Sequence, residues 1–323
     1  MISKSDKKRI AIIYPKSIDL NQKNGATLRV DSITATVAEY GEVALFPNGL
    51  FGLLSCIRFK ADITVGVFWR SAPALATMRL TKSNIWFDAC DSHIAIRKNL
   101  RSRRARNCVA IYRDRVSILF LRSVFRTYIS EKDANLDSQL WDCEKSVVLP
   151  NQILNSIDVM NNHEERVVFV GPISYEPNKK AIEYISKVFS PLLYQQSPNL
   201  QIYLYGSGTE NYQSKNIKGI GYLDDEQQIY QSDDLHIAPM NSSSGVLNKV
   251  TIPLALGLRV VTTRLATNGV KQSSNLFVSE GIEDFFEKFS EAKNSKVNPL
   301  STATTNHIPR EIREFMTRAI DYA

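Results

Sequence analysis

Cysteine and histidine are scarce in this chain of 323 residues, and neither type is spaced for metal binding. The four cysteines form no Cys-x-x-Cys motif and the four histidines form no His-Glu-x-x-His motif. The sequence therefore supports neither a zinc site nor a disulfide framework. We expect buried thiols, no bound metal and no cofactor. The cysteines are Cys56, Cys90, Cys108 and Cys143.

Long hydrophobic runs are also absent. The segment 116–121 lies between Arg115 and Arg122 and is far shorter than the ~20 residues that cross a bilayer. The apolar stretch Ile10–Tyr14 is too short for the core of a secretory signal. We therefore expect a cytoplasmic protein, at most peripheral on the inner membrane face. Because 43% of the residues are hydrophobic and 23% are charged, a disordered or collagen-like chain is excluded as well.

Acidic residues are few in the first half of the chain. Residues 1–150 hold 24 Lys and Arg against 14 Asp and Glu, whereas residues 151–323 hold 16 against 19. Between Arg97 and Arg126 the only acid is Asp114, and this basic stripe predicts an anionic partner such as a membrane surface or a phosphorylated substrate. A solvated helix face is the alternative. Nucleic acid is not expected, because the stripe lacks interleaved aromatic platforms.

Apolar runs of strand length alternate with helical patterns, which is typical of α/β domains with parallel sheets. The length favours two domains, and the polar segment 152–165 is the expected boundary. We predict domains at 1–155 and 156–306 and a closing helix within 307–323. Expected strands are Arg9–Tyr14, Glu42–Phe46, Ile63–Phe68, Asn84–Asp88, Thr127–Ser130, Val147–Leu149, Val167–Val170, Gln201–Tyr205, Ile217–Gly219, Leu235–Ala238 and Val260–Thr263. Expected helices are Ala26–Tyr40, Ala72–Leu80, Arg104–Val124, Asn178–Val188, Asp225–Ser232, Val246–Leu256 and Pro309–Tyr322.

Two glycine-bearing loops follow predicted strands of the second half, where open α/β sheets bind ligands. The first begins at Gly171-Pro172 and leads into a helix near Asn178-Lys179, whose free N–H groups suit a pyrophosphate. The second is Gly206-Ser207-Gly208, which allows close approach of a ligand to the backbone. Both loops are equally compatible with ordinary strand-to-helix turns.

A third candidate ligand-binding segment lies between Ala238 and Thr263. Here the pattern of a strand, a Ser/Gly loop, a helix, a glycine and a second strand runs with no intervening residues. The loop 241–245 can bind phosphate oxygens through N–H and hydroxyl groups, and Lys249 on the first helical turn adds positive charge. Alternatively, Lys249 extends along the helix surface into solvent. This order of elements is hard to obtain by chance, so it is the strongest of the three signals.

The motifs resemble those of GT-B glycosyltransferases of the retaining family 4, the bacterial group 1 type, over most of the chain. The second half carries Phe169-Val170-Gly171 with Pro177-Asn178, Gly206-Ser207-Gly208, Gly221-Tyr222-Leu223-Asp224-Asp225, Ala238-Pro239 with Ser244-Gly245-Val246 and Asn248-Lys249, and Ala255-Leu256-Gly257 with Val260-Val261-Thr262. The first half carries fainter echoes in Asn24-Gly25 with Arg29, Asp88-Ala89-Cys90-Asp91-Ser92, Ser130-Glu131-Lys132-Asp133 and Pro150-Asn151.

The resemblance implies two Rossmann-like domains that face each other across a cleft, with a C-terminal helix that crosses back to the first domain. It also implies a metal-independent hexosyltransferase. Such an enzyme moves a sugar, with retention, from a nucleotide-diphosphate-sugar donor to a glycan or lipid-linked acceptor in bacterial surface polysaccharide assembly. The expected donor-binding residues are Gly171, Pro172, Asn178, Lys179, Gly206, Gly208, Tyr222, Ser243, Ser244, Gly245, Val246 and Lys249. The expected acceptor- or membrane-binding residues are Arg29, Arg101, Arg103, Arg104 and Arg106.

Asp91 and His93 follow the fourth predicted strand and are the candidate catalytic residues. Either could orient or deprotonate an acceptor hydroxyl. Two other interpretations stay open, because Asp91-Ser92 is also a typical helix cap and His93 has apolar neighbours that suit a packed side chain.

The sequence departs from the family pattern at a Glu-x7-Glu pair, whose second acid grips the donor ribose. Ile252 and Ser244 stand where the family has glutamates, and Asn151 is followed by Gln152 in place of the usual glycine. Each lost hydrogen bond to a carboxylate costs on the order of 1.5–3 kcal/mol. The alternative function is therefore a catalytically silent GT-B protein that acts as a partner subunit or a glycan-binding module.

Overall fold

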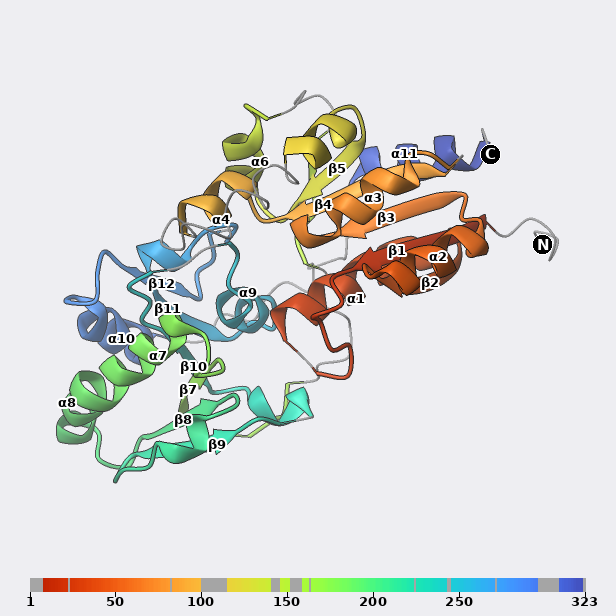
Figure 1. The fold of residues 1–323 in the computed structure, drawn as a ribbon. Helices are drawn as coiled ribbons and strands as arrows, with labels where there is room; N and C mark the ends of the chain where they lie inside the picture. Colours follow the sequence, from red (N-terminus) through yellow and green to blue (C-terminus); the bar gives the residue numbers. More distant parts are fainter. Residues whose placement is uncertain are drawn as a thin grey trace, which may run out of the picture. The chain divides into compact units, whose positions relative to one another are not determined.

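The computed structural model divides the chain into two compact units (Figure 1). The first contains Met1–Gln152 and Asn306–Ala323, and the second contains Ile153–Thr305. The C-terminal segment thus belongs to the first unit. The residues that the structure describes are 8–22, 24–81, 83–99, 115–140, 146–151, 159–162, 164–223, 225–242, 245–270, 272–295 and 308–321.

The first unit is built on a parallel six-stranded sheet with the order β2-β1-β3-β4-β5-β6. The crossover from β2 to β3 passes over β1, so this is a doubly wound sheet. Its strands are β1 (Lys8–Tyr14), β2 (Gly41–Pro47), β3 (Ile63–Val67), β4 (Asn84–Cys90), β5 (Phe125–Tyr128) and β6 (Ser146–Val148). Its helices are α1 (Gly25–Ala38), α2 (Leu50–Phe59), α3 (Ala72–Met78), α4 (His93–Asn99), α6 (Glu131–Asp137) and α11 (Arg310–Asp321).

Two apolar clusters fill the two faces of this sheet. On one face, Cys56 of α2, Leu75 of α3 and Leu121 pack against Phe87 of β4. On the other face, α1 packs together with Ile312, Met316 and Ala319 of α11. Because α11 buries its apolar stripe here, the closing helix completes the core of the first unit.

The second unit repeats the architecture with a parallel six-stranded sheet in the order β12-β11-β10-β7-β8-β9. A single apolar cluster joins its strands to the flanking helices, with Phe189, Phe285 and Phe289 at its centre. Its strands are β7 (Arg166–Val170), β8 (Gln201–Tyr205), β9 (Ile217–Gly221), β10 (Leu235–Ala238), β11 (Arg259–Thr263) and β12 (Leu276–Ser279). Its helices are α7 (Glu176–Tyr184), α8 (Ser190–Gln196), α9 (Asn248–Ala255) and α10 (Phe285–Asn294), with a π-helical turn at Ile185–Phe189 between α7 and α8.

The predicted α/β class and two-sheet arrangement are confirmed, but several elements differ from the sequence prediction. The segment Asp225–Ser232 holds only a 3-10 turn, Glu226–Ile229, because it is too polar to present an apolar helical face. Strand β5 starts at Phe125, whose ring stacks on Phe315 at 4.6 Å. Strand β12 and helices α2, α4, α6, α8 and α10 were not predicted. Of the predicted helix at 104–124, residues 104–114 lie outside the described residues, and 115–121 are helical.

Two further features of the described residues bear on function. None of their helices is long and apolar enough to span a membrane, and no group of three metal-ligating side chains gathers within them. Cys56 and Cys90 are buried free thiols, as expected, whereas Cys108 and Cys143 lie outside the described residues.

Candidate functional site

The glycine loops after β7 and β8 pack against each other. The Gly171 N–H donates to the Tyr205 carbonyl at 2.8 Å, and a Cβ on Gly206 would lie 2.5 Å from the Gly171 carbonyl carbon. Gly206 has a φ of 125°, which glycine adopts without strain. A side chain at either position would collide with its neighbours, which at Gly171 are the Asn178 amide and the Lys249 ammonium.

Asn178 connects the first loop to helix α9. Its side chain is buried in the first turn of α7 and donates to the Pro172 carbonyl at 2.9 Å. Its amide oxygen accepts a hydrogen bond from the Lys249 ammonium on α9. Asn178 is predicted to bind the donor, and in the structure its amide bonds to the Pro172 carbonyl and to Lys249.

Lys249 is the charged group at this edge of the second sheet. Its Nζ lies 4.6 Å from the centre of the Phe169 ring, and a Cβ on Gly171 would come within 2.8 Å of it. Removal from water lowers its pKa to about 7. No carboxylate among the described residues forms an ion pair with it. An ammonium held against backbone without a counter-ion is a site for an anion.

The other predicted donor residues are distributed around this core. Gly208 has a φ of 90° and gives its N–H to the Glu210 carboxylate at 2.9 Å, so this N–H is already engaged. Lys179, Pro172 and Tyr222 are exposed. Gly245 and Val246 are half-buried ahead of α9, and Ser243 and Ser244 lie outside the described residues.

Ile252 is buried on α9. The structure therefore has a packed apolar side chain at the position where the resemblance implies a carboxylate. The described part of the chain shows no acid that takes over this position.

In the first unit, the carboxyl end of β4 is strained. Cys90 has a φ of 61° and Phe68, at the end of β3, has a φ of 64°. Non-glycine residues in this region are uncommon and concentrate at functional sites. The strained turn directs Asp91 out of the sheet, and the Trp69 indole fixes it by donating to the Asp91 carbonyl at 3.1 Å.

His93 and Ser92 have structural partners. The His93 ring is buried and packs on Trp69 with the ring centres 4.2 Å apart. This contact agrees with the interpretation of His93 as a packed side chain. Ser92 caps α4, because its hydroxyl accepts the Ala95 N–H at 3.2 Å. The Asp137 carboxylate accepts the His93 N–H at 2.8 Å. The start of α4 is thus already occupied by an anion from α6.

Asp91 remains the candidate for proton transfer. Its carboxyl group is half-buried, and burial, together with the nearby Asp133, raises its pKa from 3.8 to about 6. A carboxyl group poised near neutral pH suits general acid–base work.

Replacing Asp91 with asparagine is expected to raise stability above pH 6. Because the folded-state pKa is higher than the unfolded value, stability falls as pH rises from about 4 to 6, when the buried group ionises. The variant should gain on the order of 1–2 kcal/mol at pH 7–8 and nothing near pH 4. Melting temperatures across this range test it, with the exposed Glu164→Gln as control. A gain independent of pH would show that Asp91 does not titrate there.

Two arginines do not lie where the sequence prediction placed them. Arg29 was expected to meet an acceptor or a membrane, but it is buried, with Nε 2.9 Å from an Asp88 oxygen and Nη1 2.7 Å from the Leu149 carbonyl. Arg126 is also buried, and its guanidinium donates to the Val124 carbonyl at 3.1 Å. Both guanidinium groups need internal acceptors because they are out of water. Arg101, Arg103, Arg104 and Arg106 lie outside the described residues.

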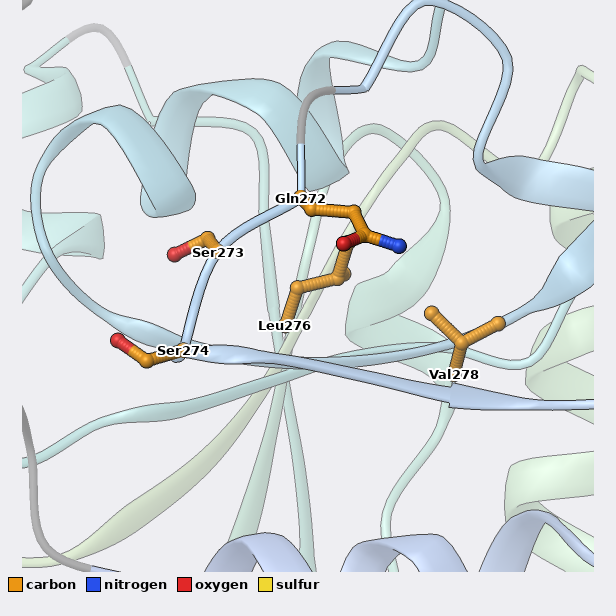
Figure 2. Close-up of a pocket in the computed structure, with 5 residues that line it drawn as sticks. All are labelled: Gln272, Ser273, Ser274, Leu276 and Val278. Atoms are coloured by element: carbon orange, nitrogen blue, oxygen red, sulfur yellow. The ribbon is translucent and has the colours of Figure 1, made fainter.

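A hollow in the second unit lies away from the glycine loops (Figure 2). Its lining comes from edge strand β12 and the segment before it, with Leu276 and Val278 on one side of the strand. None of the described residues that line it is titratable. Because it opens before β12 and the glycine loops follow β7 and β8, we do not assign it to the candidate site. The lining residues are Gln272, Ser273, Ser274, Leu276 and Val278.

Solved structures with the same fold cover almost the whole chain. The HepE protein of Anabaena in complex with UDP matches 96% of this chain and all of its own, with a TM-score of 0.63 and 12% identity. A glycosyltransferase of Rickettsia africae matches 98% and 100%, with a TM-score of 0.59 and 12% identity. The UDP-GlcNAc 2-epimerase of Methanocaldococcus jannaschii also matches 98% and 100%, with a TM-score of 0.58 and 11% identity.

These identities show a shared fold, and the epimerase shows that the fold carries more than one reaction. A comparison with curated proteins finds no match to the sequence. The family model "Glycosyl transferases group 1" matches residues 164–293, which span the glycine loops and Lys249. Residues 164–293 therefore form a glycosyl transferases group 1 domain, in a chain with the two-domain fold of the GT-B glycosyltransferases.

Proposed function

We propose that this protein transfers a hexose from a nucleotide-diphosphate-sugar donor to a glycan or lipid-linked acceptor. The observation that carries the proposal is Lys249, an ammonium that has no carboxylate partner among the described residues and lies against the backbone of Gly171. The glycosyl transferases group 1 match over the same residues supports it. UDP, which is present in the HepE structure, is the first nucleotide to test.

In the proposed reaction, the sugar–phosphate bond breaks and negative charge grows on the leaving diphosphate. Lys249 stabilises this charge, held in place by Asn178 and the Phe169 ring. Fixed positive charge where the transition state becomes anionic lowers the barrier, and no metal ion is needed for it. Asp91 orients or deprotonates the acceptor hydroxyl. Retention of the anomeric configuration is part of the proposal, and NMR of the product tests it.

The proposed setting is bacterial surface polysaccharide assembly on the cytoplasmic side of the membrane. The excess of basic residues in the first half supports it, because lipid-linked acceptors and inner-leaflet lipids are anionic. The proposed setting and the proposed role of Lys249 are independent, so evidence against one does not count against the other.

A thermal-shift panel with UDP, GDP, ADP, CMP, dTDP and their sugar conjugates tests nucleotide binding. A ligand at about 100 times its Kd stabilises the protein by ~2.7 kcal/mol, so we expect one nucleotide series to raise the melting temperature clearly. No shift with any series would contradict the donor site.

The second candidate function is a catalytically silent GT-B protein that serves as a partner subunit or a glycan-binding module. The buried Ile252 favours it, because an apolar side chain cannot accept hydrogen bonds from ribose hydroxyls. This candidate predicts no nucleotide shift, so the same panel separates the two functions.

A further inference from the structure

Helix α2 of the first unit is almost entirely uncharged, although the chain itself covers only one side of it. Arg58 is the only charged residue in the helix, and only Gly52 and Cys56 of its residues are buried. A surface helix normally carries polar side chains on the side that faces water, whereas a helix that is apolar all round is buried. The composition of α2 therefore predicts that a second surface covers its outer side.

The outer side of α2 carries a row of large apolar side chains. Leu50, Leu54 and Ile57 are 70%, 44% and 41% exposed, and Phe51 beside them is 84% exposed. A spacing of four and then three residues places Leu50, Leu54 and Ile57 on one face of the helix. The same spacing forms the seam through which two helices pair in a coiled coil. We call these four residues the α2 seam.

The position of α2 leaves the seam accessible. The helix packs on strands β1 and β2, and the Phe59 ring lies 5.6 Å from the Phe46 ring of β2. Strand β2 is the edge of the first sheet, and α3 packs further in, on β3 and β4. Helix α2 is therefore the outermost described helix on its face of this sheet (Figure 1). A second molecule can approach the seam without displacing any described part of the first unit.

We propose that two copies of the chain associate through an antiparallel, two-fold pairing of their α2 seams. In this arrangement Leu54 meets Leu54 of the second copy, and Leu50 meets Ile57 of the second copy. The seam is thus complementary to itself, as a two-fold contact requires. Arg58 lies at one end of α2, so the two-fold axis carries its counterpart to the opposite end. The only charges on the two helices therefore do not face each other.

The size of the α2 seam suits a weak dimer. Burying its four side chains on both copies removes on the order of 900 Å² of surface from water. Stable interfaces bury about 1,200–2,000 Å², and smaller ones are typical of transient complexes. We therefore expect a dissociation constant on the order of 10 µM.

Sedimentation velocity of the full chain at about 1 to 200 µM tests the proposal. We expect the average mass to rise over this range from that of a monomer towards that of a dimer. A chain that is still monomeric at about 200 µM would overturn the proposal. The assay contains no nucleotide, so its outcome does not depend on the proposed function.

Charges placed at the centre of the seam test the two-fold pairing. Leu54→Lys and Leu54→Glu should each be monomeric, because like charges meet at the axis. Mixed in equal amounts, the two variants should form a heterodimer, because an ammonium group then meets a carboxylate. A dimer that survives either substitution would overturn the pairing, and so would a loss of the dimer that mixing does not reverse.

A matched pair of variants tests whether the contact is confined to α2. Leu50→Ser should weaken the dimer by about 100-fold, because each copy loses one apolar side chain. Leu119→Ser is the control, since Leu119 is 69% exposed in the same unit but lies outside α2, and it should leave the dimer unchanged. Equal weakening by both variants would contradict the assignment to α2. Circular dichroism shows that each variant is folded.

The response to salt separates an apolar contact from a charged one. Added salt should not weaken the dimer, because the α2 seam contains no charged side chain and ions screen only charges. A dimer that dissociates as salt is added would point to a contact between charged surfaces and overturn the proposal.

Discussion

Replacing Lys249 with methionine is expected to lower the affinity for the donor nucleotide by about 10- to 100-fold. The variant should not lower the melting temperature of the unliganded protein. A hydrogen bond to a charged group contributes roughly 1.5–3 kcal/mol, which corresponds to this loss of affinity. The measurement is nucleotide titration by calorimetry, together with melting of the unliganded proteins.

The sign of the stability effect follows from the lysine's pKa. Burial lowers it in the folded protein from 10.5 to about 7, so the unfolded chain holds the proton more tightly. Stability from this group therefore rises with pH between about 7 and 10.5, and the buried ammonium is unfavourable below that window. Methionine removes this cost near neutral pH.

The same pKa predicts how wild-type binding depends on pH. Nucleotide affinity should fall as the pH rises through 7 and the ammonium loses its proton, whereas the variant should show no such fall. Lys180→Met is the control, because Lys180 is exposed on α7 and is not among the expected donor-binding residues. Undiminished affinity in Lys249→Met would refute the phosphate assignment. A lower melting temperature with unchanged affinity would make Lys249 a structural tie between Asn178 and Phe169.

Replacing Arg29 with methionine is expected to destabilise the first unit by about 3–5 kcal/mol. The guanidinium and the Asp88 carboxylate are both buried and joined by two hydrogen bonds. Removing one partner leaves an uncompensated buried charge, which is the costly case. The Asp88 carboxylate also accepts a hydrogen bond from the Thr127 hydroxyl at 2.7 Å. The substitution is therefore expected to weaken the contact between Asp88 and strand β5 as well.

Tryptophan fluorescence during urea unfolding measures this change selectively. The three tryptophans, Trp69, Trp86 and Trp141, all belong to the first unit. Arg310→Met is the matched control, because the Arg310–Glu314 pair is exposed on α11 of the same unit and exposed pairs contribute little to stability. The double variant Arg29→Met/Asp88→Leu should recover part of the loss, since it removes both charges. A loss below about 1 kcal/mol for Arg29→Met would show that the pair is solvated.

The sequence alone determined the architecture and the position of the glycine loops after β7 and β8. Alternation of strand-length and helix-length patterns predicted parallel sheets, because local periodicity reflects which face each segment buries. The close packing of Gly171 against Gly206 also has a local signal, since glycine is required where backbones meet. The resemblance to GT-B glycosyltransferases rested on these same short motifs, which the fold keeps at strand ends.

Tertiary structure decided which of the polar side chains are already bonded within the protein and which are available to a ligand. Arg29 on α1 and Lys249 on α9 are both basic. The Arg29 guanidinium is paired with the Asp88 carboxylate, whereas Lys249 has no carboxylate partner among the described residues. The Asn178 amide bonds to Lys249, and His93 is packed on Trp69. Helix α2 was missed because its apolar side chains face outward, against the usual pattern. Such outcomes depend on contacts between residues distant in sequence, which no local pattern records.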